Sequence, residues 1–340
     1  MKFSVGYQYP DEYSEERFPE ILQDYSDSIA ELYFAPGNEP GARSPAAKAS
    51  GLEENEAWEI LTEDIVETRK MGIKLNLLFN ANCLGSECIS KELQNRIVKI
   101  TGNLMDICQL DTVTTASWFI AGVLKKHFPQ LEIRASVNMK LGTLEALNYA
   151  SERFDGFCIQ RDINYHPETL RQISDWAKAN NKNICLLANS GCLNFCSART
   201  FHDNLVAHQH EIVQQEDPVR FEGICTRFLK SGENRKNILA KTNFIRPEDV
   251  VRYHDLCDGM KLATRTNFNP MAIVFAYFNG RFHGNLLDLT EPAHSAVLPD
   301  MIVANDRIPE NYIDQRFNCN GICENCNICR EIQDRATVLL

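Results

Sequence analysis

Short apolar segments alternate with longer amphipathic segments along most of the chain. The short segments are almost uniformly apolar, which is typical of parallel strands that are buried on both faces. They lie at residues 3–5, 30–35, 74–79, 104–110, 131–137, 156–159, 183–188 and 259–262. Apolar residues recur at helical spacing in the intervening residues 53–71, 90–101, 115–128, 143–151 and 168–180.

This alternation predicts an α/β fold built from repeated strand-helix units. Eight such units favour a (β/α)8-type, TIM-like barrel, complete or incomplete, because right-handed crossovers between parallel strands leave few other arrangements. An open doubly wound sheet is the alternative. We expect residues 1–290 to form the barrel, with a cysteine-bearing loop at 189–241 after the seventh strand. Residues 291–340 are expected to form a cysteine-rich C-terminal extension.

Polar residues recur where the predicted strands end. In barrels of this kind, catalytic residues lie at the C-terminal ends of the strands. A loop hydrogen bond or a helix cap is the more common explanation for any one of these residues, but their recurrence at one predicted face favours a site. They are Asn80, Asn82, Asp111, Ser136, Asn138, Gln160, Arg161, Asn189, Lys261 and Arg265. Of these, Arg161, Lys261 and Arg265 can bind an anionic substrate through charge-assisted hydrogen bonds.

The composition narrows the class of protein. A net charge of -11 over 340 residues argues against a broad nucleic-acid-binding surface, but a local basic pocket for a structured RNA stays open. No apolar run is long enough to span a bilayer. The N-terminal residues do not have the pattern of a secretory leader, so we expect a cytoplasmic protein with reduced thiols.

Two groups of cysteines indicate metal chemistry. Thiols spaced two or three residues apart can turn toward one metal centre, because a tight loop brings their sulfur atoms together. The first group is Cys192, Cys196 and Cys225, and the second is Cys319, Cys323, Cys326 and Cys329. The remaining cysteines in or beside predicted elements are expected to be small buried hydrophobic residues, namely Cys83, Cys88, Cys108, Cys158 and Cys185.

The tail group is compatible with zinc or with an iron-sulfur cluster, since both accept four thiolates. The spacing of Cys319, Cys323 and Cys326 matches that of radical S-adenosylmethionine clusters. Such clusters lie near the start of a barrel, however, so this interpretation is disfavoured. The neighbouring thiol loop favours iron in the tail.

Familiar hydrolase and nucleotide motifs are missing from the sequence. His210-Glu211 begins like a zinc-protease helix motif, but Gln214 stands where the second histidine is required. There is no nucleophile elbow, Walker loop or dinucleotide-binding glycine motif. A catalytic base among His202, His208 and His210 is one interpretation, but on a polar segment these histidines are expected to be solvated.

Several local patterns resemble peptidase family U32, which includes collagenase-like proteins and oxygen-independent hydroxylases of RNA and of a quinone precursor. The patterns are Glu31-Leu-Tyr-Phe-Ala-Pro-Gly37 with Ala42-Arg43-Ser44, Ser136-Val-Asn138, Phe157-Cys-Ile-Gln-Arg161, Asn189-Ser-Gly-Cys192, Gly223-Ile-Cys225, Arg246-Pro-Glu-Asp249 and Gly259-Met-Lys-Leu-Ala-Thr-Arg265. They span about residues 30 to 280. The cysteine loop is the most specific of them.

The resemblance implies a modified barrel that holds a 4Fe-4S cluster. Cys192 and Cys225 match the family's cluster ligands, whereas Cys196 replaces a family cysteine that is absent near Val250. Cys257, a tail cysteine or an open iron position can complete the site. Arg43, which lies in one of these patterns, is expected to bind substrate together with Asn80, Ser136, Asn138 and Asn189 at the predicted strand ends. Ala263 and Thr264 replace a glutamate and a glycine of the family, so the substrate is expected to differ.

Three functions follow from these observations. The leading hypothesis is an iron-sulfur enzyme, with one or two clusters, that carries out redox chemistry such as oxygen-independent hydroxylation. Its substrate is a small molecule or is borne on RNA, and it requires an electron donor or a homologous partner subunit. The second is a non-catalytic iron-sulfur scaffold or electron-transfer subunit. The third is a peptidase or other hydrolase with cysteine-bound zinc.

Overall fold

The computed structural model describes residues 1–10, 16–36, 52–216, 219, 221–265 and 267–340. Eight parallel strands close into a barrel in chain order, and β1 pairs with β8 through Phe3 and Met260. The strands are β1 (Phe3–Gly6), β2 (Ile29–Phe34), β3 (Lys74–Phe79), β4 (Thr112–Thr115), β5 (Glu132–Ala135), β6 (Gly156–Cys158), β7 (Asn183–Leu187) and β8 (Gly259–Lys261). The predicted TIM-like barrel is confirmed.

Helices cover the outside of the barrel. They are α1 (Phe18–Gln23), α3 (Glu54–Lys70), α4 (Lys91–Cys108), α5 (Trp118–His127), α6 (Leu144–Ala150), α7 (Pro167–Ala179) and α12 (Pro270–Phe278). Several begin at a side-chain cap, as at Ser90, whose hydroxyl accepts a hydrogen bond from the backbone of Leu93. The long connection after β7 contains α8 (Arg199–Ala207), α9 (Gln209–Ile212), α10 (Ile224–Lys230) and α11 (Ile238–Lys241).

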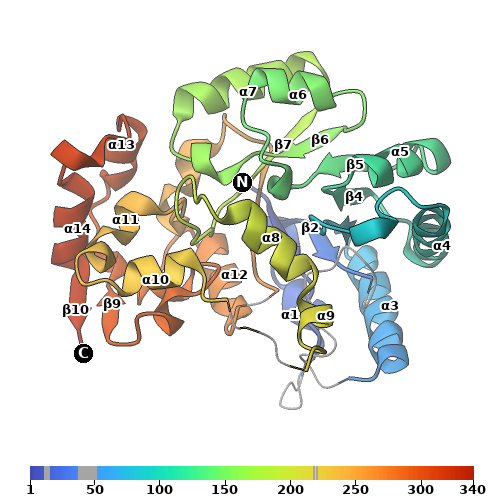
Figure 1. Cartoon of the computed structure of the whole chain (residues 1–340), viewed down its shortest axis with the longest axis horizontal. Coiled ribbons are helices and arrows are strands. Elements are labelled where there is room, and N and C mark those ends of the chain that lie inside the picture. Colours follow the sequence, from blue (N-terminus) through green and yellow to red (C-terminus); the bar gives the residue numbers. More distant parts are fainter. Residues whose placement is uncertain (11–15, 37–51, 217–218, 220, 266) are drawn as a thin grey trace.

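The C-terminal residues pack beside the barrel. They form β9 (Met301–Val303), α13 (Tyr312–Phe317), α14 (Ile328–Ala336) and β10 (Thr337–Leu339), and β9 pairs with β10 in a separate antiparallel sheet. Figure 1 shows these elements on one side of the molecule with α10 and α11, and α3, α4 and α5 on the other side. None of the helices in the described ranges is long and apolar enough to cross a membrane.

One predicted strand is wrong. Residues 104–110 belong mainly to α4, because Ile97, Thr101, Leu104 and Cys108 lie on its buried face at helical spacing. The fourth strand is the threonine-rich segment that follows it, Thr112–Thr115. Asp111 therefore precedes a strand and lies at the N-terminal end of the barrel, where its carboxylate accepts hydrogen bonds from Leu75 N and Arg69.

Polar side chains cross the interior of the barrel near its N-terminal end. Arg134 Nη1 donates to Glu31 Oε1 at 2.6 Å, and Asn76 donates to the same oxygen at 2.8 Å. Burial alone would raise the pKa of Glu31, but Arg134 and the hydrogen bonds outweigh it and lower that pKa. Thr114 donates to Asn76, which extends the network to β4.

Two cysteines expected to be free are paired. Cys158 on β6 and Cys185 on β7 are register partners, and the structure joins them in a disulfide. Both are buried as predicted, but the expectation that they are small unpaired hydrophobic residues is wrong, because the parallel register places the two side chains side by side.

Candidate functional site at the barrel mouth

Arg161 joins three segments at the C-terminal end of the barrel. It follows β6 in a short 3-10 turn, Arg161–Ile163, and only 6% of it is exposed. Its guanidinium donates to Asn138 Oδ1 at 3.3 Å and to Cys192 Sγ at 3.3 Å. The turns after β5 and β6 therefore meet the cysteine loop at this guanidinium.

The turns after β3 and β5 also contact each other. The Ser136 hydroxyl accepts a hydrogen bond from the Asn138 backbone, and Asn138 Nδ2 lies 3.5 Å from Asn80 O. The side-chain oxygens of Asn80 and Asn82 are buried, and neither has a hydrogen-bond partner within the part of the chain that is described. These two acceptors can bind a donor group of a substrate.

The structure assigns Asn189 a different task from the one predicted. It is fully buried, its Nδ2 donates to Ala263 O and Leu289 O, and its Oδ1 accepts from Ala263 N at 2.7 Å. Both polar atoms of the side-chain amide therefore bond to backbone, which joins the end of β7 to the residues after β8 and to Leu289. Asn189 therefore holds these segments of the barrel mouth together and is not exposed to a substrate. This position corrects its assignment as a binding residue.

The loop that carries Cys192 is held by the segment that follows residue 288. Gly191 N donates to Glu291 O at 2.9 Å, and His294 Nε2 lies 2.6 Å from Gly191 O. A Cβ at Gly191 would stand 2.8 Å from Pro292 O, so glycine is required by this close approach. On the other side, Asp162 Oδ1 accepts from Phe195 N at 2.6 Å. Sequence patterns gave no sign of His294 or Asp162, since both act on backbone far away in the chain.

Cys192, Cys196 and Cys225 are neighbours in space. Burial raises the pKa of Cys225, and the negative charges of Cys192 and then Cys196 raise it further. Cys225 lies in the first turn of α10, and all three cysteines are partly exposed. No three ligating side chains in the described ranges are arranged to hold a metal ion. The donor set suits a thiolate-bound centre, but binding requires the sulfur atoms to draw together.

Lys261 and Arg265 lie on another side of the mouth. Lys261 ends β8, and its Nζ lies 3.7 Å from the centroid of the Tyr33 ring. Arg265 packs against the end of β1, where a Cβ on Gly6 would stand 2.7 Å from its Cγ. Burial raises the pKa of Tyr9 to about 12, although the charge of Arg265 opposes the shift. Arg43 lies outside the described residues.

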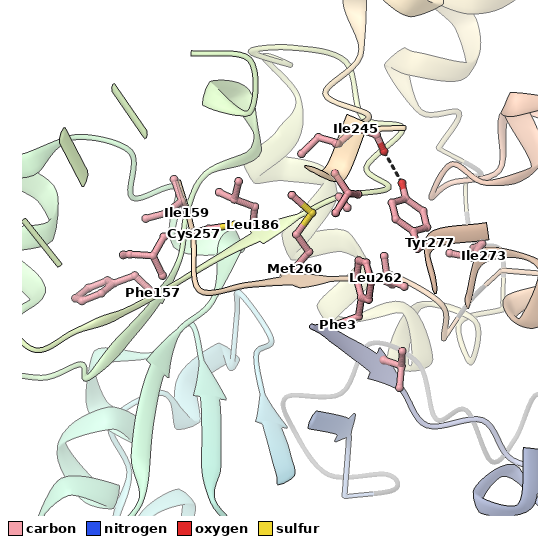
Figure 2. Packing of buried hydrophobic residues seen from close by; sticks show 14 of the residues in the cluster. Phe3, Phe157, Ile159, Leu186, Ile245, Cys257, Met260, Leu262, Ile273 and Tyr277 are labelled. Carbon is pink, nitrogen blue, oxygen red and sulfur yellow. Dashed lines mark hydrogen bonds between the residues drawn. The ribbon is translucent and has the colours of Figure 1, made fainter. Parts of the chain in front are cut away.

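Cys257 is remote from the loop thiols. It precedes β8, and its neighbour Asp258 accepts a hydrogen bond from Ile184 N at the start of β7, whereas Cys192 follows the end of β7. Figure 2 shows Cys257 in the apolar cluster with Phe157. Burial raises the pKa of its thiol to about 12. The geometry therefore argues against Cys257 as the fourth ligand.

Cys319, Cys323 and Cys326 lie between α13 and α14, and Cys329 lies in the first turn of α14, near Cys319 and Cys323. Burial raises the pKa of Cys329, with Arg316 opposing and the charges of Cys319 and Cys323 adding to the shift. Arg316 is buried over the Tyr165 ring, 3.8 Å from its centroid, and donates to Leu239 O. Cys326 is exposed to solvent. Cys319 and Cys329 thus lie near a buried cation that contacts α11.

Comparisons with known proteins agree with this architecture. No protein-family model matches the chain. The uncharacterized protease MJ1657 of Methanocaldococcus jannaschii is 24% identical over 284 residues, which is 82% of this chain and 82% of the relative. The solved structure of the U32 peptidase Mk0906 superimposes with a TM-score of 0.53 at 14% identity, covering 77% of this chain and 92% of that one. The likeness in sequence to a named protease, and in fold to a U32 peptidase, agrees with the resemblance of this chain to peptidase family U32.

Proposed function

We propose that this chain is a redox enzyme of the U32 type, whose thiolate-bound metal centre lies at the barrel mouth. The observation that carries the proposal is the contact of the Arg161 guanidinium with Cys192 Sγ at 3.3 Å, with Cys196 and Cys225 beside it. A cation next to several thiols favours their ionised form, which is the form that binds metal.

Cys192, Cys196 and Cys225 would hold the centre, a 4Fe-4S cluster. When bound, such a cluster supplies or accepts single electrons. We infer oxygen-independent hydroxylation as the reaction class from the resemblance to the family. An external electron donor or a partner subunit is then required.

The remaining residues of the mouth bind and orient the substrate. Arg161 and Lys261 place positive charge at the ends of β6 and β8, and Arg265 adds a third cation beyond β8. These groups suit an anionic small molecule or a nucleotide of an RNA. Ser136, Asn138 and Asn80 form the uncharged part of the rim.

The tail cysteines Cys319, Cys323, Cys326 and Cys329 would form a second thiolate site, with iron-sulfur as our assignment and zinc as the alternative. The buried charge of Arg316 balances part of their negative charge. This site lies apart from the mouth and has no assigned role in substrate binding.

Metal and sulfide analysis after anaerobic purification tests the proposal. Wild-type protein should be brown and contain iron and sulfide. Cys192→Ala, Cys196→Ala and Cys225→Ala should each lose iron while the far-UV circular dichroism stays close to that of the wild type. Cys88→Ala, which changes an exposed cysteine, is the matched control and should keep its iron. Unchanged iron in all three loop variants would refute the assignment. Comparing metabolites and RNA modifications with and without the protein then identifies the substrate.

A further inference from the structure

Cys83 and His208 meet at the rim of the mouth, away from the three loop cysteines. Cys83 lies in the turn after β3, and His208 lies between α8 and α9. The thiol and the imidazole form a side-chain hydrogen bond. His208 Nδ1 lies 2.8 Å from Glu211 Oε2, so the other ring nitrogen, Nε2, is left for the thiol. The arrangement is a nucleophile, a base and an acid that orients the base.

The electrostatics of this group suit a reactive thiol. The hydrogen bond from His208 lowers the pKa of Cys83, and the Gly85 N–H adds to the effect. The same bond, followed by Glu211, raises the pKa of His208. Both shifts favour a thiolate paired with an imidazolium. His208 keeps 29% of its side chain exposed, and Cys83 is only partly buried, so a substrate can reach the pair.

α8 ties the pair to the rest of the mouth. At its start, Arg199 lies 3.8 Å from Asp162, which follows β6. Thr200 accepts a hydrogen bond from Lys140, which follows β5. His208 follows its end and contacts the turn after β3. The helix thus spans the turns after three strands, and it is drawn across the barrel in Figure 1.

We propose that Cys83, His208 and Glu211 form a second catalytic site, which hydrolyses an ester or amide through an acyl-thioester on Cys83. Glu211 is a positioning residue, since it reaches the reacting atoms only through His208. This inference goes beyond the redox function proposed above and does not depend on a metal.

The reaction uses only these three side chains and water. The Cys83 sulfur attacks the acyl carbon and forms a C–S bond. The C–O or C–N bond breaks, and the leaving alcohol or amine takes the proton held by His208. Water then gives a proton to His208 and attacks the thioester. The C–S bond breaks, the carboxylic acid leaves and the thiolate-imidazolium pair is restored.

Acylation by p-nitrophenyl acetate tests the proposal on the full chain. Rapid acid quenching and mass spectrometry should find the acetyl group on Cys83, with p-nitrophenol released in a burst. Cys83→Ala should abolish the burst. His208→Gln should slow it by at least about tenfold at pH 6.5, because the thiolate is then less populated. Glu211→Gln should slow it several-fold, and shift its pH profile, since the imidazole loses the group that orients it.

Cys88→Ala is the control, since Cys88 is an exposed cysteine five residues further along the chain. It should acylate at the wild-type rate. Acetylation of Cys88 in place of Cys83, or a burst that is unchanged in His208→Gln, would overturn the proposal. Iron content separates the two proposals, because Cys83→Ala should retain all the iron that Cys192→Ala loses.

Discussion

At the residue scale, Arg161 contributes both to the fold and to the site. It is nearly buried, and its guanidinium holds Asn138 and Cys192 in place. Arg161→Ala leaves these two groups without their donor, so we expect the free energy of unfolding to fall by about 2 kcal/mol, as for a hydrogen bond to a charged group. Urea denaturation measures this. Arg171→Ala, on the exposed face of α7, should stay within about 0.5 kcal/mol of the wild type. Equal stability of the two variants would show that Arg161 does not support the fold.

His294 makes the stability of the mouth depend on pH. Burial lowers the pKa of His294, although the Gly191 carbonyl opposes the shift. Its Nδ1 is buried without a partner in the described structure, so the neutral ring is favoured in the folded chain. The unfolded chain takes up a proton below about pH 6.5, whereas the folded chain takes it up only at a lower pH, so stability falls as the pH is lowered from about 6.5.

We expect His294→Gln, which keeps a donor for Gly191 O, to flatten this dependence between about pH 7 and 5. Thermal unfolding at several pH values measures the slope. His283→Gln is the control, because it removes a histidine that is not buried. An equal slope in wild type and His294→Gln would contradict the account.

At the scale of elements, one buried amide connects two strand ends to the segment that holds the cysteine loop. Asn189 makes three hydrogen bonds to the backbone of Ala263 and Leu289. Asn189→Ala removes all three and leaves buried groups unpaired, so we expect a loss of about 3 kcal/mol. Proteolysis should show early cleavage near residues 189–196. Asn183→Ala at the exposed start of the same strand is the control and should change little. Resistance to cleavage equal to that of the control would exclude this role.

Strands with a run of apolar residues were predictable, even where one side chain joins the polar interior, whereas the threonine-rich β4 was not. The predicted bounds 74–79 are those of β3, because Leu75, Leu77, Leu78 and Phe79 form a buried apolar run. β4 was missed because Thr112 and Thr114 point toward polar neighbours such as Asn76, so they do not give an apolar run. The end of α4 then supplied a misleading apolar segment.

The same limit applies to the site. Strand ends predicted that Asn80, Asn138 and Arg161 meet, because parallel strands place their C-terminal ends together. Sequence spacing could not show that Cys257 lies before its strand end or that Asn189 faces inward. Nor could it show the contact of Cys83 with His208, since these residues are separated by four strands and the long loop.

At the scale of the whole molecule, the C-terminal residues stabilise the long connection after β7. Gln333 on α14 is buried, accepts from Leu239 N and donates to Arg235 O. Gln333→Ala leaves both backbone groups unpaired, so we expect a loss of about 2 kcal/mol and faster hydrogen exchange in residues 234–241. Arg335→Ala on the exposed side of the same helix should have neither effect. Unaltered exchange in Gln333→Ala would show that α14 does not support this segment.

The ion pair inside the barrel limits how the protein can evolve. Glu31 and Arg134 come from β2 and β5, and both side chains are almost fully enclosed. Loss of either charge leaves the other buried without a partner, which lowers the free energy of unfolding by about 3 to 5 kcal/mol. Exchange of both residues for apolar ones can be nearly neutral. A single substitution at either position therefore passes through an unstable intermediate. In diverging descendants of this chain, the two positions should stay fixed together or change together.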